Sequence, residues 1–320
     1  MKEKGLWILN DIKPEHLEKL KEIAPDHEIV NSNDGQSDFP VENIEIVYGW
    51  DKTETKEARL LETEGKLKWI QVSSAGVDYM DLDTLEDRSI MLTNASGIHS
   101  VPIAESVIGM LLAYCRKIQQ AIVDQSQHHW REDQRLVELS GKTIMIVGTG
   151  NIGKELGRLS KAFNMKTIGI NRSGREVEHM DHIFQQPDMI DHLEKADIVV
   201  NILPLTSETK NFFDQKMFAE MKEETLFINV GRGPTVNTED LIQALDDGKV
   251  AFAGLDVFET EPLPEDSPLW DRKDVLITPH ISGNAEHYNT RLFNIFEENI
   301  RAFVEGKELP RNLVDYDKSY

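Results

Sequence analysis

The chain has 320 residues, which at about 150 residues per domain predicts two domains. Its 35 basic and 57 acidic side chains give a net charge of −22 at pH 7, and a surface this acidic repels phosphate backbones, so the composition disfavours a nucleic-acid partner. The single cysteine, Cys115, excludes an internal disulfide and a cysteine-based zinc site.

The first hundred residues alternate short apolar runs with helix-like segments. Strands are predicted at residues 6–9, 28–30, 44–48, 69–72 and 90–93. Helices are predicted at residues 14–23 and 56–64, and Pro14 suits the first turn of the first of them. This alternation predicts a parallel sheet with helices on its faces.

A second α/β run follows a longer helix-like stretch at residues 102–122. We interpret the polar segment 124–139 after this stretch as an excursion between domains that could contact another subunit. Strands are then predicted at residues 143–147, 166–170, 198–202, 226–230, 251–255 and 275–278. Helices are predicted at residues 152–164 and 285–304. The pattern therefore predicts a second α/β domain.

The chain carries no apolar segment of the kind that targets or spans a membrane. No apolar run of signal-peptide length precedes Asp11. The longest apolar stretch, residues 101–115, is interrupted by Glu105 and is too short to cross a bilayer. We therefore expect a cytoplasmic protein with no membrane partner.

A glycine-rich segment joins the predicted strand at 143–147 to the helix that follows it. Its residues fit the pattern G-x-G-x-x-G, and they are Gly148, Thr149, Gly150, Asn151, Ile152 and Gly153. The first glycine allows a tight turn, the second lets a pyrophosphate approach the backbone, and the third lets helix and strand pack closely. The N–H groups at the helix start, around Asn151 and Ile152, can bind phosphate. A dinucleotide site is predicted, and the alternative is an ordinary tight turn.

The end of the next predicted strand, residues 166–170, bears on which dinucleotide binds. An NAD site usually places Asp or Glu there to bind the ribose 2′-hydroxyl, but this strand ends in Asn171, Arg172 and Ser173. Arg172 can pair with a 2′-phosphate and Ser173 can donate a hydrogen bond to it. This end favours NADP(H). The alternative is that Arg172 stacks on adenine or lies in solvent and that NAD binds without the acid.

Arg232, Glu261 and His280 each lie just beyond the carboxyl end of a different predicted strand. Ligands bind at that edge of an open α/β sheet, so the three residues are predicted to face one cleft beside the cofactor. A histidine can deliver a proton near neutral pH, a carboxylate can hold its ring, and an arginine can bind a carboxylate and polarise a carbonyl. This set fits the reduction of a 2-oxo acid. Any one of the three residues alone is more often a surface residue than a catalytic one.

Several segments, in order along the chain, resemble the motifs of the D-2-hydroxyacid dehydrogenases. They are residues 148–153, 203–206, 229–233, 254–262 and 278–283, with two further segments at 74–78 and 103–105. The resemblance implies an α/β fold in which a Rossmann-type doubly wound parallel sheet, residues 102–284, is inserted into a second, smaller flavodoxin-like α/β domain, residues 1–101 and 285–320. It implies that the larger domain binds the dinucleotide, that the smaller binds substrate and that the protein is a homodimer.

The resemblance also implies roles for single residues. Arg232 would bind the substrate carboxylate and carbonyl, and His280 would be the acid/base with Glu261 as its partner. Asp256 would hold the nicotinamide carboxamide. The remaining implied contacts are Pro204, Val230 and Gly231 with the cofactor, and Ser74, Ala75 and Gly76 with the substrate carboxylate through backbone amides.

The segment Asn171-Arg172-Ser173 departs from the acidic end of NAD-type members and resembles the NADP-preferring glyoxylate and hydroxypyruvate reductases. The leading hypothesis is therefore a cytoplasmic, NADPH-dependent reductase of small 2-oxo acids, without a metal. NAD stays open as a cofactor. The alternatives are an NAD-dependent D-2-hydroxyacid dehydrogenase and a non-catalytic dinucleotide-sensing protein like the corepressors related to this family.

Overall fold

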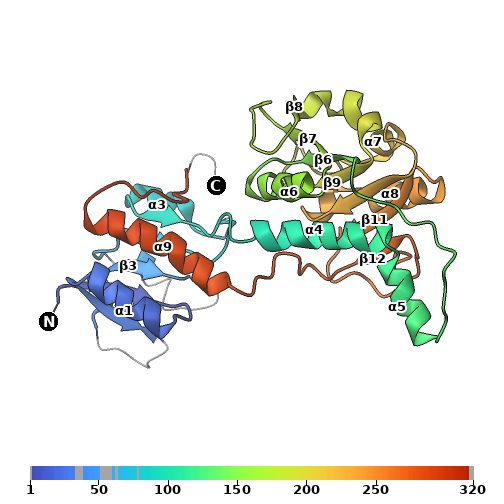
Figure 1. Cartoon of the computed structure of the whole chain (residues 1–320). Coiled ribbons are helices and arrows are strands. Elements are labelled where there is room, and N and C mark those ends of the chain that lie inside the picture. Colours follow the sequence, from blue (N-terminus) through green and yellow to red (C-terminus); the bar gives the residue numbers. More distant parts are fainter. Residues whose placement is uncertain (1, 33–38, 51–59, 62–63, 78, 317–320) are drawn as a thin grey trace. The chain divides into compact units, whose positions relative to one another are not determined.

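The computed structural model describes residues 2–32, 39–50, 60–61, 64–77 and 79–316 (Figure 1). The chain divides into a first unit, Met1–Ile98 with Ala285–Tyr320, and a second unit, His99–Asn284, which is inserted into the first. The predicted break after residue 101 falls inside helix α4 (Ser100–Cys115), whereas the observed break precedes this helix. The helix predicted at residues 56–64 lies outside the described residues except at 60–61 and 64.

The first unit is built on a five-stranded sheet in the order β2-β1-β3-β4-β5, with every neighbouring pair parallel. Its strands are β1 (Lys4–Ile8), β2 (His27–Asn31), β3 (Ile44–Tyr48), β4 (Trp69–Gln71) and β5 (Met91–Thr93). Its described helices are α1 (Pro14–Ile23), α3 (Leu82–Asp87) and α9 (Tyr288–Val304), with a short 3₁₀ turn, η2 (Val41–Asn43). This is the strand order of flavodoxin-like sheets, so the predicted fold of this part is confirmed.

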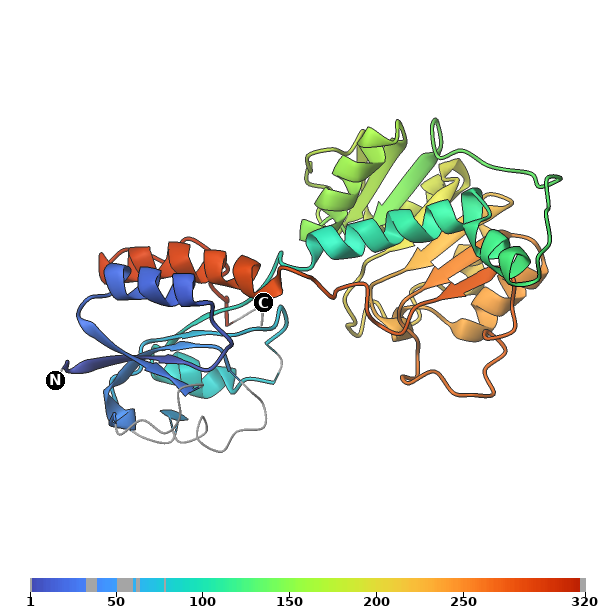
Figure 2. The same ribbon diagram turned by 60° about the horizontal axis from the view of Figure 1, so that its bottom comes forward.

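Successive residues of these strands enter two separate cores, because side chains of a strand alternate between the faces of its sheet. Leu6 and Ile8 of β1 pack in the cluster that includes residues of α1 and α9, which lie side by side (Figure 2). Trp7, between them, belongs to the other cluster, with Leu85 of α3. Both faces are covered, which explains why the strands read as continuous apolar runs.

The second unit is built on a seven-stranded parallel sheet in the order β12-β11-β10-β9-β6-β7-β8. Its strands are β6 (Thr143–Val147), β7 (Lys166–Asn171), β8 (His182–Gln185), β9 (Ile198–Asn201), β10 (Thr225–Asn229), β11 (Val250–Leu255) and β12 (Val275–Ile277). Its helices are α4, α5 (Ile118–Ser126), α6 (Asn151–Ala162), α7 (Gln215–Ala219) and α8 (Thr238–Asp246), with 3₁₀ segments η3 (Gln186–Lys195) and η4 (Gly233–Thr235). This order confirms the predicted Rossmann-type doubly wound sheet.

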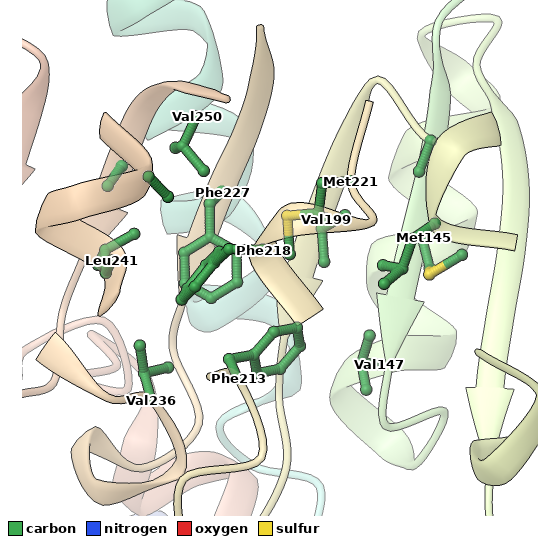
Figure 3. Close-up of a cluster of buried hydrophobic side chains, with 14 of the residues drawn as sticks. Met145, Val147, Val199, Phe213, Phe218, Met221, Phe227, Val236, Leu241 and Val250 are labelled. Carbon is green, nitrogen blue, oxygen red and sulfur yellow. The ribbon is translucent and has the colours of Figure 1, made fainter. Parts of the chain in front are cut away.

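Helices cover both faces of this second sheet. On one face Met145 of β6 and Phe227 of β10 lie in a cluster with Phe218 of α7, which Figure 3 shows together. On the other face Ile146 of β6 packs in a cluster with Leu111 of α4. Truncation of a buried phenylalanine such as Phe227 costs about 3–5 kcal/mol in comparable cores. The two cores hold the strand ends in fixed positions and so support the loops at the edge of the sheet.

Some helices and strands differ from the sequence prediction. The helix predicted at residues 102–122 is two helices, α4 and α5, because Lys117 between them adopts a left-handed conformation with φ of +55°. Helix α9 begins at Tyr288 rather than at residue 285. The short helix α3 and the edge strand β8 were not predicted. Among the described residues, no helix combines the length and the apolar character needed to cross a membrane.

Candidate active site

The carboxyl ends of the strands in the second unit share one edge of its sheet, because neighbouring strands are parallel. The loops at this edge carry Gly148 after β6, Asn171 at the end of β7, Arg232 after β10, Glu261 after β11 and His280 after β12. The strand order reverses between β6 and β9, the position at which open α/β sheets bind ligands. The topology therefore brings the predicted residues to the edge that binds ligands in such sheets.

The glycine loop after β6 has a backbone that fits a closely approaching dinucleotide. Gly148 has a φ of +105°, a conformation that residues with side chains rarely adopt. A Cβ atom on Gly153 would lie 2.3 Å from the carbonyl oxygen of Gly148, so packing requires the third glycine. A Cβ atom on Gly150 would meet no described atom within 4 Å, so this position opens onto free space where α6 begins. A pyrophosphate fits this space, beside the N–H groups of the first turn of α6.

The loop after β7 presents two exposed arginines. Within the described part of the chain, the side chains of Arg172 and Arg175 form no hydrogen bond or ion pair. Asn171 Nδ2 donates at 3.0 Å both to Thr149 Oγ1 and to the carbonyl oxygen of Arg175, and its Oδ1 accepts from the N–H of Ser173 at 3.2 Å. The predicted cofactor contact Asn171 thus braces this loop against the glycine loop, while the two guanidinium groups are free to bind an anion.

His280 and Glu261 form the closest polar pair among the three predicted catalytic residues. Their Nδ1 and Oε2 atoms lie 2.7 Å apart, and the other carboxylate oxygen of Glu261 accepts from the N–H of Phe258 at 2.9 Å. His280 has a φ of +54°, which for a residue with a side chain costs about 1 kcal/mol or more. Its ring is half exposed, and no hydrogen bond reaches its Nε2 from the described residues. The carboxylate therefore fixes one ring nitrogen and leaves the other for a substrate.

The buried carboxylate of Asp256 holds the loop that carries His280. It accepts hydrogen bonds from the hydroxyls of Thr278 and Ser282, each at 2.5 Å, and from the N–H groups of Ile281 and Ser282. The carbonyl oxygen of Asp256 accepts from the N–H of His280 at 2.8 Å. The resemblance implies a contact from Asp256 to the nicotinamide. In this structure its carboxylate oxygens accept hydrogen bonds from the loop that carries His280. The sequence did not indicate this structural role.

His99 is a second anchor of the same loop that the sequence did not reveal. Its Nδ1 lies 2.8 Å from the carbonyl oxygen of Gly283. In the sequence His99 stands close to the predicted domain boundary at residue 101, and nothing in its spacing indicates a contact with residue 283. The segment from Thr278 to Gly283 is therefore fixed by Asp256 at its centre and by His99 at its end.

Arg232 lies in a tight turn, and the positions on both sides of it, Gly231 and Gly233, have no room for a side chain. A Cβ atom on Gly231 would lie 2.6 Å from the carbonyl oxygen of Leu203, and one on Gly233 would lie 1.8 Å from that of Phe258. The Arg232 side chain is exposed, and its Nη1 donates to the carbonyl oxygen of Gly231 at 2.8 Å. Close packing of the turn against the segments after β9 and β11 thus fixes where the arginine leaves the backbone.

The predicted substrate contacts of the first unit follow strand β4. Ser74 Oγ donates to the carbonyl oxygen of Gly76 and lies 2.7 Å from the hydroxyl of Tyr79. Ala75 and Gly76 are exposed, and among the described residues no partner accepts from their backbone N–H groups. These N–H groups can bind an anion.

A cavity of about 630 Å³ in the second unit lies away from the predicted residues. It is lined by Tyr114, Leu136 and Lys142 among others, and it includes Ile198 and Leu226 near the starts of β9 and β10 and none of the residues at the ends of these strands. None of Arg232, Glu261 and His280 lines it. The volume of this cavity alone would place a site at the opposite edge of the sheet from the three predicted catalytic residues. The types and positions of these side chains therefore define the candidate site.

The fold and this edge define a dinucleotide-binding oxidoreductase of the Rossmann type. The family model described as "D-isomer specific 2-hydroxyacid dehydrogenase, NAD binding domain" matches residues 108–282. The chain belongs to this family of NAD(P)-dependent enzymes, which act on small 2-oxo and 2-hydroxy acids, and the resemblance found in the sequence is confirmed.

Relatives of known name and structure agree with this assignment. A glyoxylate reductase from Thermofilum pendens is 33% identical over 269 residues, which cover 82% of this chain and 79% of the relative. A D-isomer specific 2-hydroxyacid dehydrogenase family protein from Aeromonas salmonicida is 34% identical, with a TM-score of 0.80 over 98% of this chain and 100% of that one. An NADPH-dependent glyoxylate/hydroxypyruvate reductase from Sinorhizobium meliloti, in complex with NADP and sulfate, is 27% identical, with a TM-score of 0.75 over 99% and 100%.

Proposed function

We propose that the protein reduces a small 2-oxo acid of the glyoxylate or hydroxypyruvate class to the D-2-hydroxy acid, with NADPH as the preferred reductant. The observation that carries the proposal is the His280–Glu261 pair, 2.7 Å apart, at the same sheet edge as Arg232 and the glycine loop. The relatives named glyoxylate reductase support the substrate class, and the similar structures that hold NADP or NADPH support the cofactor.

In this proposal His280 handles the proton and Glu261 holds the ring. Hydride addition to the carbonyl carbon is the chemistry that the dinucleotide supplies when bound. Nε2 of His280 donates a proton to the carbonyl oxygen as negative charge develops there. Glu261 accepts from Nδ1–H, which holds the ring in one orientation with Nε2 facing away from the carboxylate.

Arg232 binds the substrate in this proposal. Its guanidinium is a planar donor that can take the substrate carboxylate through two parallel hydrogen bonds and polarise the adjacent carbonyl. In the first unit, the N–H groups of Ser74, Ala75 and Gly76 are proposed to bind a carboxylate. Substrate orientation then comes from groups that are themselves fixed by packed turns, which lowers the entropic part of the barrier.

The product of hydroxypyruvate reduction tests this proposal. We expect the purified protein to convert hydroxypyruvate and NADPH into D-glycerate, identified by chiral chromatography. Unchanged hydroxypyruvate, or L-glycerate as the product, would contradict the proposal.

Arg172 and Ser173 are proposed to bind the 2′-phosphate of NADPH. Arg172→Ala is expected to raise KM for NADPH about 10-fold and to change KM for NADH by less than about 2-fold, because only NADPH carries the phosphate that pairs with the guanidinium. Steady-state kinetics with both cofactors measures the difference. Arg158→Ala is the control, since Arg158 is an exposed arginine of α6 that pairs with Glu155. Equal losses with both cofactors would place Arg172 outside a phosphate site.

The exposed apolar residues around α5 support a homodimer as the functional form. Ile118, Ile122 and Val123 of α5 are exposed, and Trp130 in the following segment is 86% exposed. An exposed apolar segment of this kind is costly in water and is typical of a protein contact. We propose that a second copy of the chain covers it.

Ile122→Asp is expected to convert the dimer into single chains, because it places a charge in an apolar contact. Size-exclusion chromatography with light scattering measures the mass. Val304→Asp, at an exposed valine of α9, is the control and should leave the dimer intact. A wild-type protein that elutes as a single chain, or an Ile122→Asp variant that stays dimeric, would contradict this surface.

A further inference from the structure

Three polar side chains lie wholly buried behind the turn that carries Arg232. Asn201 ends β9, Asn229 ends β10 and Thr235 ends the 3₁₀ turn η4, and none exposes more than 1% of its surface. None of the three is among the residues assigned a part in catalysis or binding above. A buried amide or hydroxyl is costly unless it is hydrogen-bonded, so their partners matter.

The three side chains form one connected chain of hydrogen bonds. Asn201 uses both hydrogens of Nδ2, one donated to Asn229 Oδ1 at 3.0 Å and one to Thr235 Oγ1 at 2.6 Å. Asn201 Oδ1 accepts from the N–H of Leu203 at 3.1 Å. Since the Thr235 hydroxyl accepts from Asn201, its own hydrogen is free to be donated elsewhere.

Both ends of this network reach the backbone beside Arg232. Thr235 Oγ1 donates to the carbonyl oxygen of Arg232 at 2.6 Å, and Asn229 Oδ1 accepts from the N–H of Gly231 at 3.2 Å. The peptide group between Val230 and Gly231 and the one between Arg232 and Gly233 are therefore tied to the end of the neighbouring strand β9. No other side chain of the described residues forms a hydrogen bond with these two backbone groups.

We propose that Asn201, Asn229 and Thr235 are positioning residues that set the direction of Arg232 and thereby the affinity for the 2-oxo acid. The proposal rests on the proposed role of Arg232 as the substrate ligand. The turn has little freedom to compensate, because Gly231 and Gly233 are packed against backbone atoms. A shift of about 1 Å in a substrate-binding group can cost 10²-fold in rate, so loss of one link should be visible in kinetics.

The chain offers a matched control for this network. Thr225 at the start of β10 is also wholly buried, and its hydroxyl also donates at 2.6 Å to the carbonyl oxygen three residues earlier, that of Lys222. Thr225 begins the strand whose other end leads to Arg232, so it lies at the opposite edge of the sheet. Replacing either threonine by valine removes a similar hydrogen bond at nearly constant volume, but only one replacement touches the network.

The test compares Thr235→Val with Thr225→Val in the full chain. Thr235→Val is expected to raise KM for glyoxylate about 10-fold and to lower kcat by a smaller factor, while Kd for NADPH changes by less than about 2-fold. Thr225→Val is expected to lower the melting temperature to a similar extent and to leave KM within about 2-fold of wild type. Thr235→Ser, which keeps the hydroxyl, should restore KM to within about 3-fold of wild type.

Two results would overturn the proposal. The first is a Thr235→Val variant, or a Thr235→Ala variant if valine prevents folding, that melts at a lower temperature but binds glyoxylate as wild type does. The second is an Arg232→Ala variant with unchanged KM and kcat for glyoxylate, which would remove the role of Arg232 itself. The two failures are distinct, because in the first case Arg232→Ala still abolishes the affinity for glyoxylate.

Discussion

His280→Ala is expected to lower kcat for 2-oxo acid reduction by about 10²-fold or more, because the variant has no side chain that can donate a proton to the carbonyl oxygen. Binding of NADPH should stay nearly unchanged, since the glycine loop and the loop after β7 lie on other strands than the one that leads to His280. The measurement is steady-state oxidation of NADPH, with cofactor affinity followed by the fluorescence of the reduced nicotinamide.

His182→Ala is the matched control for this change. His182 is an exposed histidine at the start of the edge strand β8, so it lies at the opposite edge of the sheet from the loops that carry Arg232 and His280, and its loss should leave kcat unchanged. If His280→Ala kept wild-type turnover, the acid/base assignment would be wrong, and the pairing with Glu261 would have only a structural role.

Arg232→Lys is expected to lower kcat/KM for glyoxylate by about 10²-fold, which corresponds to about 2.7 kcal/mol of transition-state binding. Lysine keeps the charge, but it cannot form two parallel hydrogen bonds with a carboxylate. KM for NADPH should change by less than about 2-fold, because the guanidinium contacts the substrate rather than the dinucleotide in this account.

A second variant separates loss of charge from loss of geometry. Arg232→Ala should lose more activity than Arg232→Lys, and added guanidinium ion should restore part of it, since the ion can occupy the vacated position. A lysine variant with wild-type kcat/KM would show that charge alone suffices and that the planar fork of donors has no part in substrate binding.

The sheet and the glycine loop were predictable because their signals are local. Strand β6 is a continuous apolar run, and the segment from Gly148 to Gly153 follows it directly. The three strand-end residues were predictable for a different reason. Parallel strands bring their carboxyl ends to one edge, so Glu261 and His280, which the structure places 2.7 Å apart, could be expected to meet without knowledge of the side-chain geometry.

The parts that sequence reasoning missed depend on contacts between distant residues. The break between α4 and α5 falls at Arg116 and Lys117, where neither glycine nor proline marks it. Strand β8 is an edge strand with two half-buried residues, so its apolar pattern is weak. The hydrogen bond from Ser282 to Asp256 joins residues 26 positions apart, and no pattern in the sequence predicts such a bond.

Asn171 has a structural role that its position in the sequence did not indicate. The sequence placed it at the end of the strand that sorts NAD from NADP, and position alone suggested a cofactor contact. In the structure its side-chain amide forms hydrogen bonds with Thr149, Ser173 and Arg175. These bonds hold the loop that carries Arg172. A short polar side chain at a turn often binds the nearby backbone in this way.

The net charge of −22 limits the classes of partner that the protein can bind, but it does not describe the local charges at this edge of the sheet. Arg172 and Arg175 form no side-chain hydrogen bond or ion pair with the described residues, and we propose that they make a local site for anions with the N–H groups at the start of α6. The phosphates of a dinucleotide need only such a local site. The backbone of a nucleic acid would contact a much larger part of the acidic surface and be repelled by it.

The proposed reduction of a small 2-oxo acid with NADPH at this sheet edge has a decisive test in the wild-type protein. The most direct measurement is kcat/KM of the purified wild-type protein for NADPH and for NADH, each with glyoxylate and with hydroxypyruvate at saturation. We expect turnover with both acids and a kcat/KM for NADPH about 10-fold or more above that for NADH. Absence of turnover with both cofactors, or a kcat/KM for NADH equal to or above that for NADPH, would contradict it.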